Sequence, residues 1–298
     1  MSSGYVILAE RGVIALRGDD ARGLLQGVIS SDIARVTSAS ASYGALLTPQ
    51  GKYLFDFVIV QLGDALVLDA ERARLDDLMR RLLMYRLRAK VEIEDRSDDL
   101  EIAALLGDDV ATRLELPARP GAARALNDGV VLIDPRLARL GGRAVLPRGH
   151  SAPALEDLGF AALPPAAYER ARLALGVPDG SRDLVVDRST LLESGFEELR
   201  GVDFQKGCFV GQELTARMKY RGLVRKRLMP VAFDGPPPAP GTPIRLDGKD
   251  AGEMRSSQDG HGIALLRLEQ VAQAAEGGVP LLADATEVIP HKPDWARF

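Results

Sequence analysis

The segment from Gly201 to Gly222, GVDFQKGCFVGQELTARMKYRG, contains the only cysteine of the 298-residue chain, Cys208. From Lys206 to Arg227 there are seven basic side chains and one acidic side chain, whereas the whole chain has a net charge of −4. The glycines on either side of the cysteine permit positive φ angles and close approach of the backbone to other groups. The segment therefore predicts a sharp loop with the cysteine near its tip.

A helix is expected to follow this loop, because residues 212–220, QELTARMKY, have high helical propensity. The N-terminus of a helix stabilises anions and thiolates, and the ammonium group of Lys206 would also favour a thiolate at Cys208. We therefore predict that Cys208 is the functional thiol and that Lys206 tunes it. In the alternative interpretation, the cysteine is a small buried hydrophobic residue and the basic side chains form a solvated surface.

The segment KGCFVGQELTARMKYRG resembles the signature of the YgfZ family, K-G-C-[FY]-x-G-Q-E-x-x-x-R followed by a basic residue and Arg-Gly. The matching residues are Lys206, Gly207, Cys208, Phe209, Gly211, Gln212, Glu213 and Arg217. The resemblance implies the fold of the glycine-cleavage T-protein, an aminomethyltransferase. It also implies a folate-binding factor for the assembly or repair of iron–sulfur enzymes. A tRNA-thiolating enzyme depends on such factors, so an indirect role in tRNA modification is implied as well.

The content of cysteine and histidine limits the metal chemistry of the chain. One cysteine and three scattered histidines, His150, His261 and His291, exclude the usual zinc spacing and a four-cysteine cluster within one chain. We therefore predict no permanently bound metal. An iron–sulfur cluster would be cargo, to which Cys208 supplies at most one transient ligand.

Composition also guides the expected location and partners. No window approaches eighteen apolar residues, the N-terminal segment lacks the pattern of a signal peptide, and a single cysteine excludes an internal disulfide. These features predict a cytoplasmic protein without a membrane partner. A net charge of −4 and an aromatic content of 5% argue against direct specific binding of nucleic acid, although the basic segment leaves an RNA-binding module as a third hypothesis.

The chain is longer than a typical single domain. Short apolar strands alternate with helices up to about residue 224, and evenly spaced short strands follow the proline-rich segment DGPPPAPG. This pattern predicts an α+β protein with a small C-terminal β-barrel, and the resemblance implies a T-protein-like arrangement of three domains. The expected domains are residues 1–45 with 149–224, which carry the KGC motif, then residues 46–148, and finally residues 225–298.

One long amphipathic helix is expected over residues 71–89. Its apolar residues recur with i, i+3, i+4, i+7 spacing and the opposite face is charged. The predicted core-facing residues are Leu75, Leu78, Met79, Leu82 and Leu83.

The resemblance also implies three folate contacts. TPQGKYLFDF is similar to a turn and strand in which the T-protein has an aspartate that contacts folate and assists catalysis, and Asp56 matches it. Within an apolar strand this carboxylate needs a partner; alternatively, it lies on an edge strand and faces solvent. Phe57 stands where the T-protein segment has a second carboxylate.

ARLALGVP resembles the family pattern Arg-x-x-x-Gly-x-Pro, which places Arg172 near the folate region. A guanidinium can bind a folate carboxylate in bidentate fashion, whereas the alternative is an exposed helix arginine. In STLLESGFEEL, Glu193 matches a family glutamate, and Leu191 replaces the proline that often precedes it.

The leading functional prediction is a folate-binding factor, with tetrahydrofolate or a derivative as cofactor, that assists [4Fe–4S] enzymes. Its partners would be folate and iron–sulfur assembly proteins or client enzymes. The sequence features are more consistent with an assembly factor than with an enzyme. The alternative is a tetrahydrofolate-dependent aminomethyl or one-carbon transferase that uses Asp56 as acid or base. Phe57 and the unusual Cys208 count against the transferase.

Overall fold

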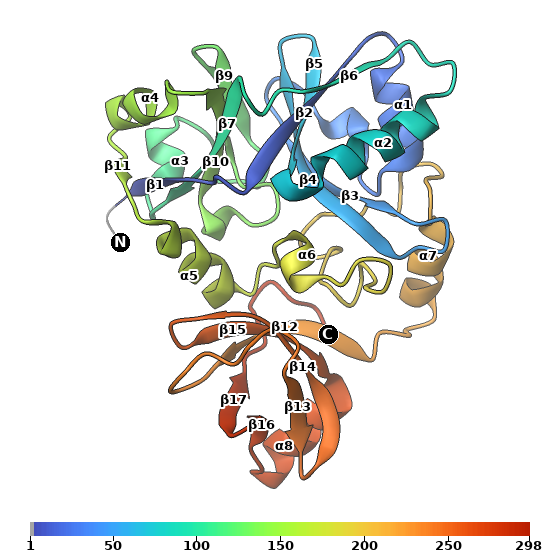
Figure 1. Ribbon diagram of the computed structural model, residues 1–298, viewed down its shortest axis with the longest axis vertical. Coiled ribbons are helices and arrows are strands. Elements are labelled where there is room, and N and C mark those ends of the chain that lie inside the picture. The colour runs from blue at the N-terminus through green and yellow to red at the C-terminus, as the bar shows by residue number, and fades with distance from the viewer. Residues whose placement is uncertain (1–2) are drawn as a thin grey trace. The chain divides into compact units, whose positions relative to one another are not determined.

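The computed structural model describes residues 3–298 and divides them into two compact units (Figure 1). The first unit comprises the residues up to Gln50, Leu54–Tyr168 and Leu199–Gln212. The second comprises Gly51–Tyr53, Glu169–Glu198 and Glu213–Phe298.

The first unit contains a five-stranded sheet with the order β3-β4-β5-β2-β6. Its strand β4 has the sequence YLFDFVIVQL and is almost entirely buried, as expected for a continuous apolar run in the middle of a sheet. Asp56 therefore lies on an interior strand. The strands are β2 (Arg11–Arg17), β3 (Ser42–Leu47), β4 (Tyr53–Leu62), β5 (Ala65–Glu71) and β6 (Glu92–Asp95).

A six-stranded sheet in the same unit has the order β11-β1-β7-β10-β9-β8. All its pairs are antiparallel except β1 with β11. Apolar side chains from β7, β9 and β10 pack with those of the neighbouring helices in one core cluster. The strands are β1 (Gly4–Ile7), β7 (Leu100–Leu106), β8 (Ala123–Leu126), β9 (Gly129–Ile133), β10 (Gly142–Pro147) and β11 (Ala161–Ala162).

Two amphipathic helices accompany the five-stranded sheet. Helix α1 (Ala21–Val28) buries one apolar stripe, and helix α2 (Leu75–Arg86) buries Leu75, Leu78 and Leu82. The amphipathic helix predicted within residues 71–89 is therefore present, although it covers only Leu75–Arg86. Of its predicted core-facing residues, Leu83 is exposed. The other helices of this unit are α3 (Val110–Arg113), α4 (Ser151–Asp157) and the 3₁₀ turns Ile33–Arg35, Arg72–Arg74 and Ala138–Leu140.

The second unit ends in a closed six-stranded barrel with the order β12-β15-β14-β13-β16-β17. Its inward-facing side chains form one core, and helix α8 (Leu268–Gly277) packs against it. The β-barrel predicted for residues 225–298 is thus confirmed. The strands are β12 (Lys226–Ala232), β13 (Pro243–Leu246), β14 (Lys249–Gln258), β15 (His261–Arg267), β16 (Leu281–Ala283) and β17 (Thr286–Pro290).

Three helices precede the barrel: α5 (Pro165–Leu175), α6 (Gly180–Asp183) and α7 (Gln212–Tyr220). The predicted separation of residues 1–45 from residues 46–148 does not match the sheets. Strand β2 pairs with β5, and β1 pairs with β7, so both sheets contain strands from either side of residue 45. Sequence-local alternation could not reveal these long-range pairings.

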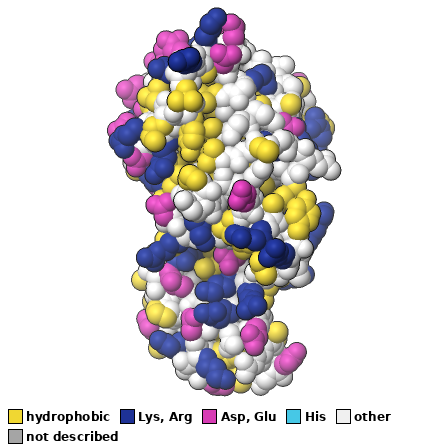
Figure 2. All heavy atoms as spheres, turned by 90° about the vertical axis from the view of Figure 1, so that its right-hand side faces the viewer, with side chains coloured by type: hydrophobic (Ala, Val, Ile, Leu, Met, Phe, Trp, Pro, Cys, Tyr) yellow, Lys and Arg dark blue, Asp and Glu magenta, His cyan; other side chains and the backbone are white. Residues whose placement is uncertain are grey.

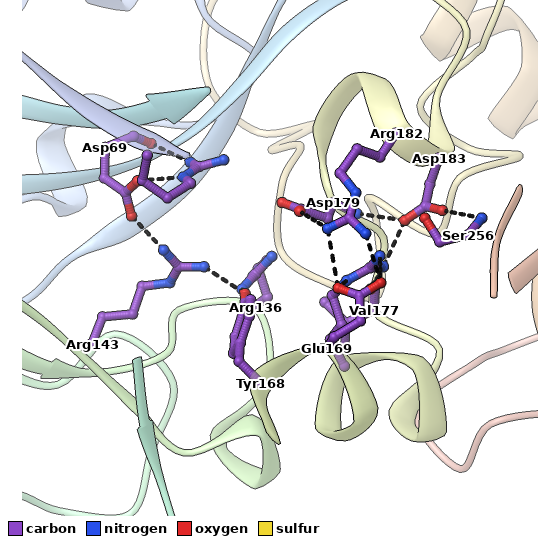
Figure 3. Close-up of polar contacts among 12 residues, drawn as sticks. Asp69, Arg136, Arg143, Tyr168, Glu169, Val177, Asp179, Arg182, Asp183 and Ser256 are labelled. Carbon is purple, nitrogen blue, oxygen red and sulfur yellow. Dashed lines mark hydrogen bonds and ion pairs between the residues drawn. The ribbon is translucent and has the colours of Figure 1, made fainter. Parts of the chain in front are cut away.

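A buried network of ion pairs connects the two sheets of the first unit (Figure 3). Arg143 on β10 contacts Asp69 on β5 at 2.5 Å and Asp134, just after β9, at 3.1 Å. Arg11 on β2 is a second cation for Asp69, and its Nε donates to Asp69 Oδ1 at 2.6 Å. The hydroxyl of Tyr168 accepts a hydrogen bond from Arg143 at 2.8 Å.

The charges of this network are compensated. Arg136 binds both carboxylate oxygens of Asp134, with distances of 3.0 and 2.8 Å. Burial alone would raise the pKa of Asp134, but Arg136 and Arg143 hold it below its usual value. The carboxylate therefore remains ionised in the core.

The first testable prediction concerns Arg143. We expect Arg143→Met to lower the free energy of unfolding by about 3 kcal/mol or more, since it leaves two buried carboxylates short of a cation. Urea unfolding followed by circular dichroism measures this loss. Arg80→Met is the matched control, because Arg80 makes an exposed ion pair with Asp77 and such pairs contribute about 1 kcal/mol or less. Equal effects of the two substitutions would contradict the role of Arg143.

Candidate functional site

The loop that carries the KGC motif is fixed to helix α1 and the residues after it. The backbone N–H of Asp203 donates to Ser30 O at 2.9 Å, and the Ser30 hydroxyl donates to Gly201 O at 2.5 Å. On the other side of the motif, the N–H of Val210 donates to Gly27 O at 3.2 Å. Both ends of the loop are therefore held by the same region of the first unit.

Lys206 is the central anchor of this loop. Its ammonium donates to the backbone carbonyls of Gln26, Ile29 and Ser31 at 2.8, 2.6 and 2.9 Å. These carbonyls lie at and just beyond the C-terminal end of α1, where a cation satisfies unpaired acceptors and interacts favourably with the helix dipole. The contacts give Lys206 an anchoring role, while its predicted tuning of Cys208 stays a prediction.

The environment of Lys206 also affects its protonation. Burial lowers the pKa of Lys206 to about 8, and the nearby carboxylates of Asp32 and Asp203 oppose this change. The side chain remains an ammonium at neutral pH, so all three hydrogen bonds to carbonyls are available there.

Cys208 is exposed, so the alternative of a buried small hydrophobic residue is wrong. Its neighbour Phe209 is buried and donates its backbone N–H to Gln212 Oε1 at 3.3 Å. Gly211 adopts a φ of 80°, which explains the glycine at the point where the loop turns into α7. The loop thus holds Phe209 inward and leaves the thiol accessible to a partner.

The remaining motif residues, Glu213 and Arg217, lie exposed on α7 and belong to the second unit. Although their spacing of four residues suits a pair, no ion pair joins them in residues 3–298. Lys219 on the same helix instead pairs with Glu197.

Asp56 is buried and accepts a hydrogen bond from the Tyr43 hydroxyl at 2.8 Å. Strand β4 lies in the interior of the sheet, so Asp56 is not on an edge strand. The expectation that a carboxylate in this apolar strand has a partner is confirmed. Burial, and then the charge of Asp56, raises the pKa of Tyr43 well above its usual value. The phenol therefore stays protonated and donates to the carboxylate.

Arg172 is fully buried rather than an exposed helix arginine. Its guanidinium binds Glu169 through Nε at 2.8 Å and Nη2 at 2.6 Å, and binds Asp183 through Nη1 at 2.7 Å (Figure 3). Asp183 also accepts the backbone N–H of Ser256 on β14 at 3.0 Å. These contacts give Arg172 a structural role within the second unit. Its direct contact with folate stays a prediction that this geometry does not support.

Glu193 lies in a pocket of about 290 Å³ in the second unit. Its carboxylate accepts a hydrogen bond from Thr190 Oγ1 at 2.8 Å. Three basic residues, Arg188, Lys226 and Arg255, also line this pocket. Arg255 contacts Glu253 through Nη1, but its Nε is buried without a hydrogen-bond partner. The pocket therefore offers three cations, one buried donor without a partner, and the carboxylates of Asp183, Glu193 and Glu253.

Sequence reasoning missed Lys226 and Arg255 as members of this pocket. They come from β12 and β14, far along the chain from Glu193, and only barrel closure brings them to it. The predicted site residues thus fall into two groups. Cys208, Lys206 and Asp56 belong to the first unit, whereas Arg172 and Glu193 belong to the second.

Within residues 3–298, no three side chains of His, Cys, Asp or Glu converge to hold a metal ion. None of the helices in that part of the chain combines the length and the apolar character needed to cross a membrane.

The second testable prediction concerns the pH dependence of the Lys206 anchor. Because the pKa of Lys206 is lowered from 10.5 to about 8, the unfolded chain binds a proton over this range that the folded chain has lost. The stability contributed by this residue therefore rises as pH increases through that range. We expect urea unfolding to show the wild type gaining stability relative to Lys206→Met between about pH 7 and about pH 9.5. Lys249→Met, at an exposed position, is the control, and a pH-independent difference for Lys206→Met would refute the expectation.

Comparison with solved structures identifies the fold. The structure of glycine cleavage system aminomethyltransferase T from Bartonella henselae aligns with a TM-score of 0.78 at 17% identity, covering 99% of this chain and 86% of that one. The predicted T-protein-like α+β fold is thus confirmed. At this identity the likeness concerns the fold alone.

Comparisons of sequence identify the relatives. The model of the C-terminal β-barrel domain of CAF17 matches residues 225–298. The iron–sulfur cluster assembly factor IBA57, mitochondrial, of Mus musculus is 32% identical over 96% of this chain and 83% of its own length. The human protein of the same name is 31% identical with the same coverage, and the Mycosarcoma maydis homologue is 32% identical over 89% and 74%. This chain therefore belongs to the IBA57 family of iron–sulfur cluster assembly factors, which confirms the resemblance seen in its KGC motif.

Proposed function

We propose that this protein assists the assembly or repair of [4Fe–4S] clusters in client enzymes and uses Cys208 as its chemical group. The observation that carries the proposal is an exposed thiol on a loop that Lys206 fixes to three carbonyls. A cysteine that is both fixed and accessible suits transient ligation of a cluster that is passed between proteins. The names of the relatives support the same role.

Tetrahydrofolate, or a derivative, is the proposed cofactor. Its glutamate carboxylates match the cations Arg188, Lys226 and Arg255, and Arg255 Nε is a buried donor that lacks a partner. Glu193 is an acceptor for donor groups of the ligand. When bound, tetrahydrofolate supplies a carrier for one-carbon units. Contact of Asp56 with folate is part of the proposal and depends on the likeness of fold.

Partners follow from this function. Assembly proteins or client enzymes would approach Cys208, and any effect on tRNA would be indirect, through a cluster-dependent thiolating enzyme. The protein itself is proposed to bind no specific nucleic acid and to act in the cytoplasm, in line with its composition.

A second candidate is a tetrahydrofolate-dependent aminomethyl or one-carbon transferase. The observation in its favour is Asp56, a buried carboxylate held by Tyr43 on a fold shared with an aminomethyltransferase. Phe57 beside it is fully buried and apolar, so a second carboxylate is missing at this place. The assembly role therefore accounts for more of the site.

The third testable prediction concerns Cys208 in cells. In a deletion strain, we expect [4Fe–4S] enzyme activities and tRNA thiomethylation to fall, and wild type but not Cys208→Ser to restore them. Recovery by Cys208→Ser would make the thiol dispensable. Unchanged activities after deletion would refute the assembly role, and folate-dependent release of ammonia from an aminomethylated carrier would then support the transferase.

The fourth testable prediction concerns folate. We expect Arg255→Met to weaken binding of tetrahydrofolate by about tenfold, as for loss of a hydrogen bond to a charged group. Isothermal titration calorimetry measures the change. Arg245→Met is the matched control, since Arg245 lies on the same barrel but outside this pocket. Equal affinity of wild type and Arg255→Met would exclude the pocket as the folate site.

A further inference from the structure

The C-terminal end of helix α2 exposes apolar side chains that the core does not need. Leu75, Leu78 and Leu82 already form the buried stripe of the helix, and α2 packs through it against β2 and β6. The next apolar residues, Leu83, Met84 and Leu87, are 42%, 69% and 86% exposed. We call residues 83–90 the α2 end.

Leu87 carries a second cost besides its exposure. It is the C-cap of the helix and adopts φ 47° and ψ −108°. A non-glycine residue seldom adopts a positive φ, and this combination of φ and ψ also lies outside the left-handed helical region that the usual C-cap residues occupy, so Leu87 is strained. A large apolar residue that is both strained and solvent-exposed is not explained by stability. Such outliers concentrate at functional positions.

The charged side chains within this stretch of sequence are of one sign. Between Leu78 and Val91 the sequence has five basic residues and no acidic residue. Within residues 3–298, only Arg80 among them forms an ion pair, with Asp77. The carboxylate of Asp20 accepts a hydrogen bond from the backbone N–H of Lys90 at 2.8 Å and forms no ion pair with the ammonium of that residue. The basic residues are Arg80, Arg81, Arg86, Arg88 and Lys90.

We propose that the α2 end is a docking surface for a partner protein that has an apolar pocket with an acidic rim. The projecting Met84 and Leu87 would fill the pocket, and Arg86, Arg88 and Lys90 would face the carboxylates. Apolar anchors and arginines are typical of the energetic centre of protein interfaces, and methionine adapts to irregular pockets. On one face, Figure 2 shows hydrophobic side chains gathered in one area, bordered by both basic and acidic side chains.

The observations favour a protein over a membrane. An interfacial helix lays a long apolar face into the lipid, but the long apolar face of α2 is buried against its own sheet. What remains exposed is about the last turn of the helix and its cap. That shape suits insertion into a pocket of a partner.

This surface goes beyond the proposed function and does not depend on Cys208. It nevertheless lies in the same unit as the KGC loop. Helix α1 contacts α2 and also supplies the Gln26 carbonyl that binds Lys206. A partner docked on the α2 end would therefore be attached to the same part of the molecule that holds the thiol.

The fifth testable prediction begins with identification of the partner. A photo-crosslinking amino acid is placed at position 87 in the full-length protein in its native cells, and at Ile289, an exposed apolar position on the barrel, as the control. We expect a discrete protein adduct from position 87 only, mapped by mass spectrometry to an acidic peptide of the partner. No adduct specific to position 87, or an adduct with a second copy of this chain, would overturn the proposal.

Binding to the purified partner then tests the chemistry. We expect Leu87→Asn to weaken binding by about tenfold or more without loss of thermal stability, since the Leu87 side chain is exposed and contributes little buried apolar area. Arg88→Glu should weaken binding similarly, whereas Ile289→Asn and Cys208→Ser should leave it unchanged. Affinity unaffected by Leu87→Asn and Arg88→Glu would overturn the proposal, as would binding to phosphatidylglycerol vesicles that these two variants abolish.

Discussion

The buried ion pairs of Arg143 connect the two sheets of the first unit, and the rest of that unit depends on them. Arg143 reaches Asp69 on one sheet and Asp134 beside the other, while Arg11 and Arg136 complete the two carboxylate shells. Charges in a core are costly unless each has its partner. Because removal of one member would leave another uncompensated, the network fixes the relation between the sheets, which apolar packing alone would specify less narrowly.

The KGC loop uses the same principle at the molecular surface. Three carbonyls at the end of α1 lack helical partners, and the Lys206 ammonium satisfies all of them. Lys206 thereby satisfies carbonyls at the end of a helix and fixes the KGC loop, while the neighbouring thiol of Cys208 stays exposed. This combination suits the transient ligation that we propose for Cys208, since a mobile thiol would present no defined ligand and a buried thiol could not reach a partner.

The second unit also contains buried charges, and their surroundings differ. Arg172 is enclosed by Glu169 and Asp183, and Asp183 continues the contact to the barrel through the backbone of Ser256. In the pocket that contains Glu193, by contrast, Arg255 retains a buried unpaired Nε. A buried donor without a partner is rare in proteins. Arg172, whose guanidinium is fully paired, therefore supports the fold, whereas Arg255, with its unpaired Nε, is suited to binding a ligand.

The sequence by itself determined the family, the α+β class and the terminal barrel, because motif identity and local periodicity are properties of neighbouring residues. It also left open whether Asp56 and Arg172 were buried. Tertiary structure alone decided that Asp56 bonds to Tyr43, that Arg172 is enclosed by carboxylates, and that Lys226 and Arg255 join Glu193. It also decided the pairing of β2 with β5 and β1 with β7. The physical reason is that strand pairing and charge compensation join residues distant in the chain, and no local pattern encodes which distant partner is chosen.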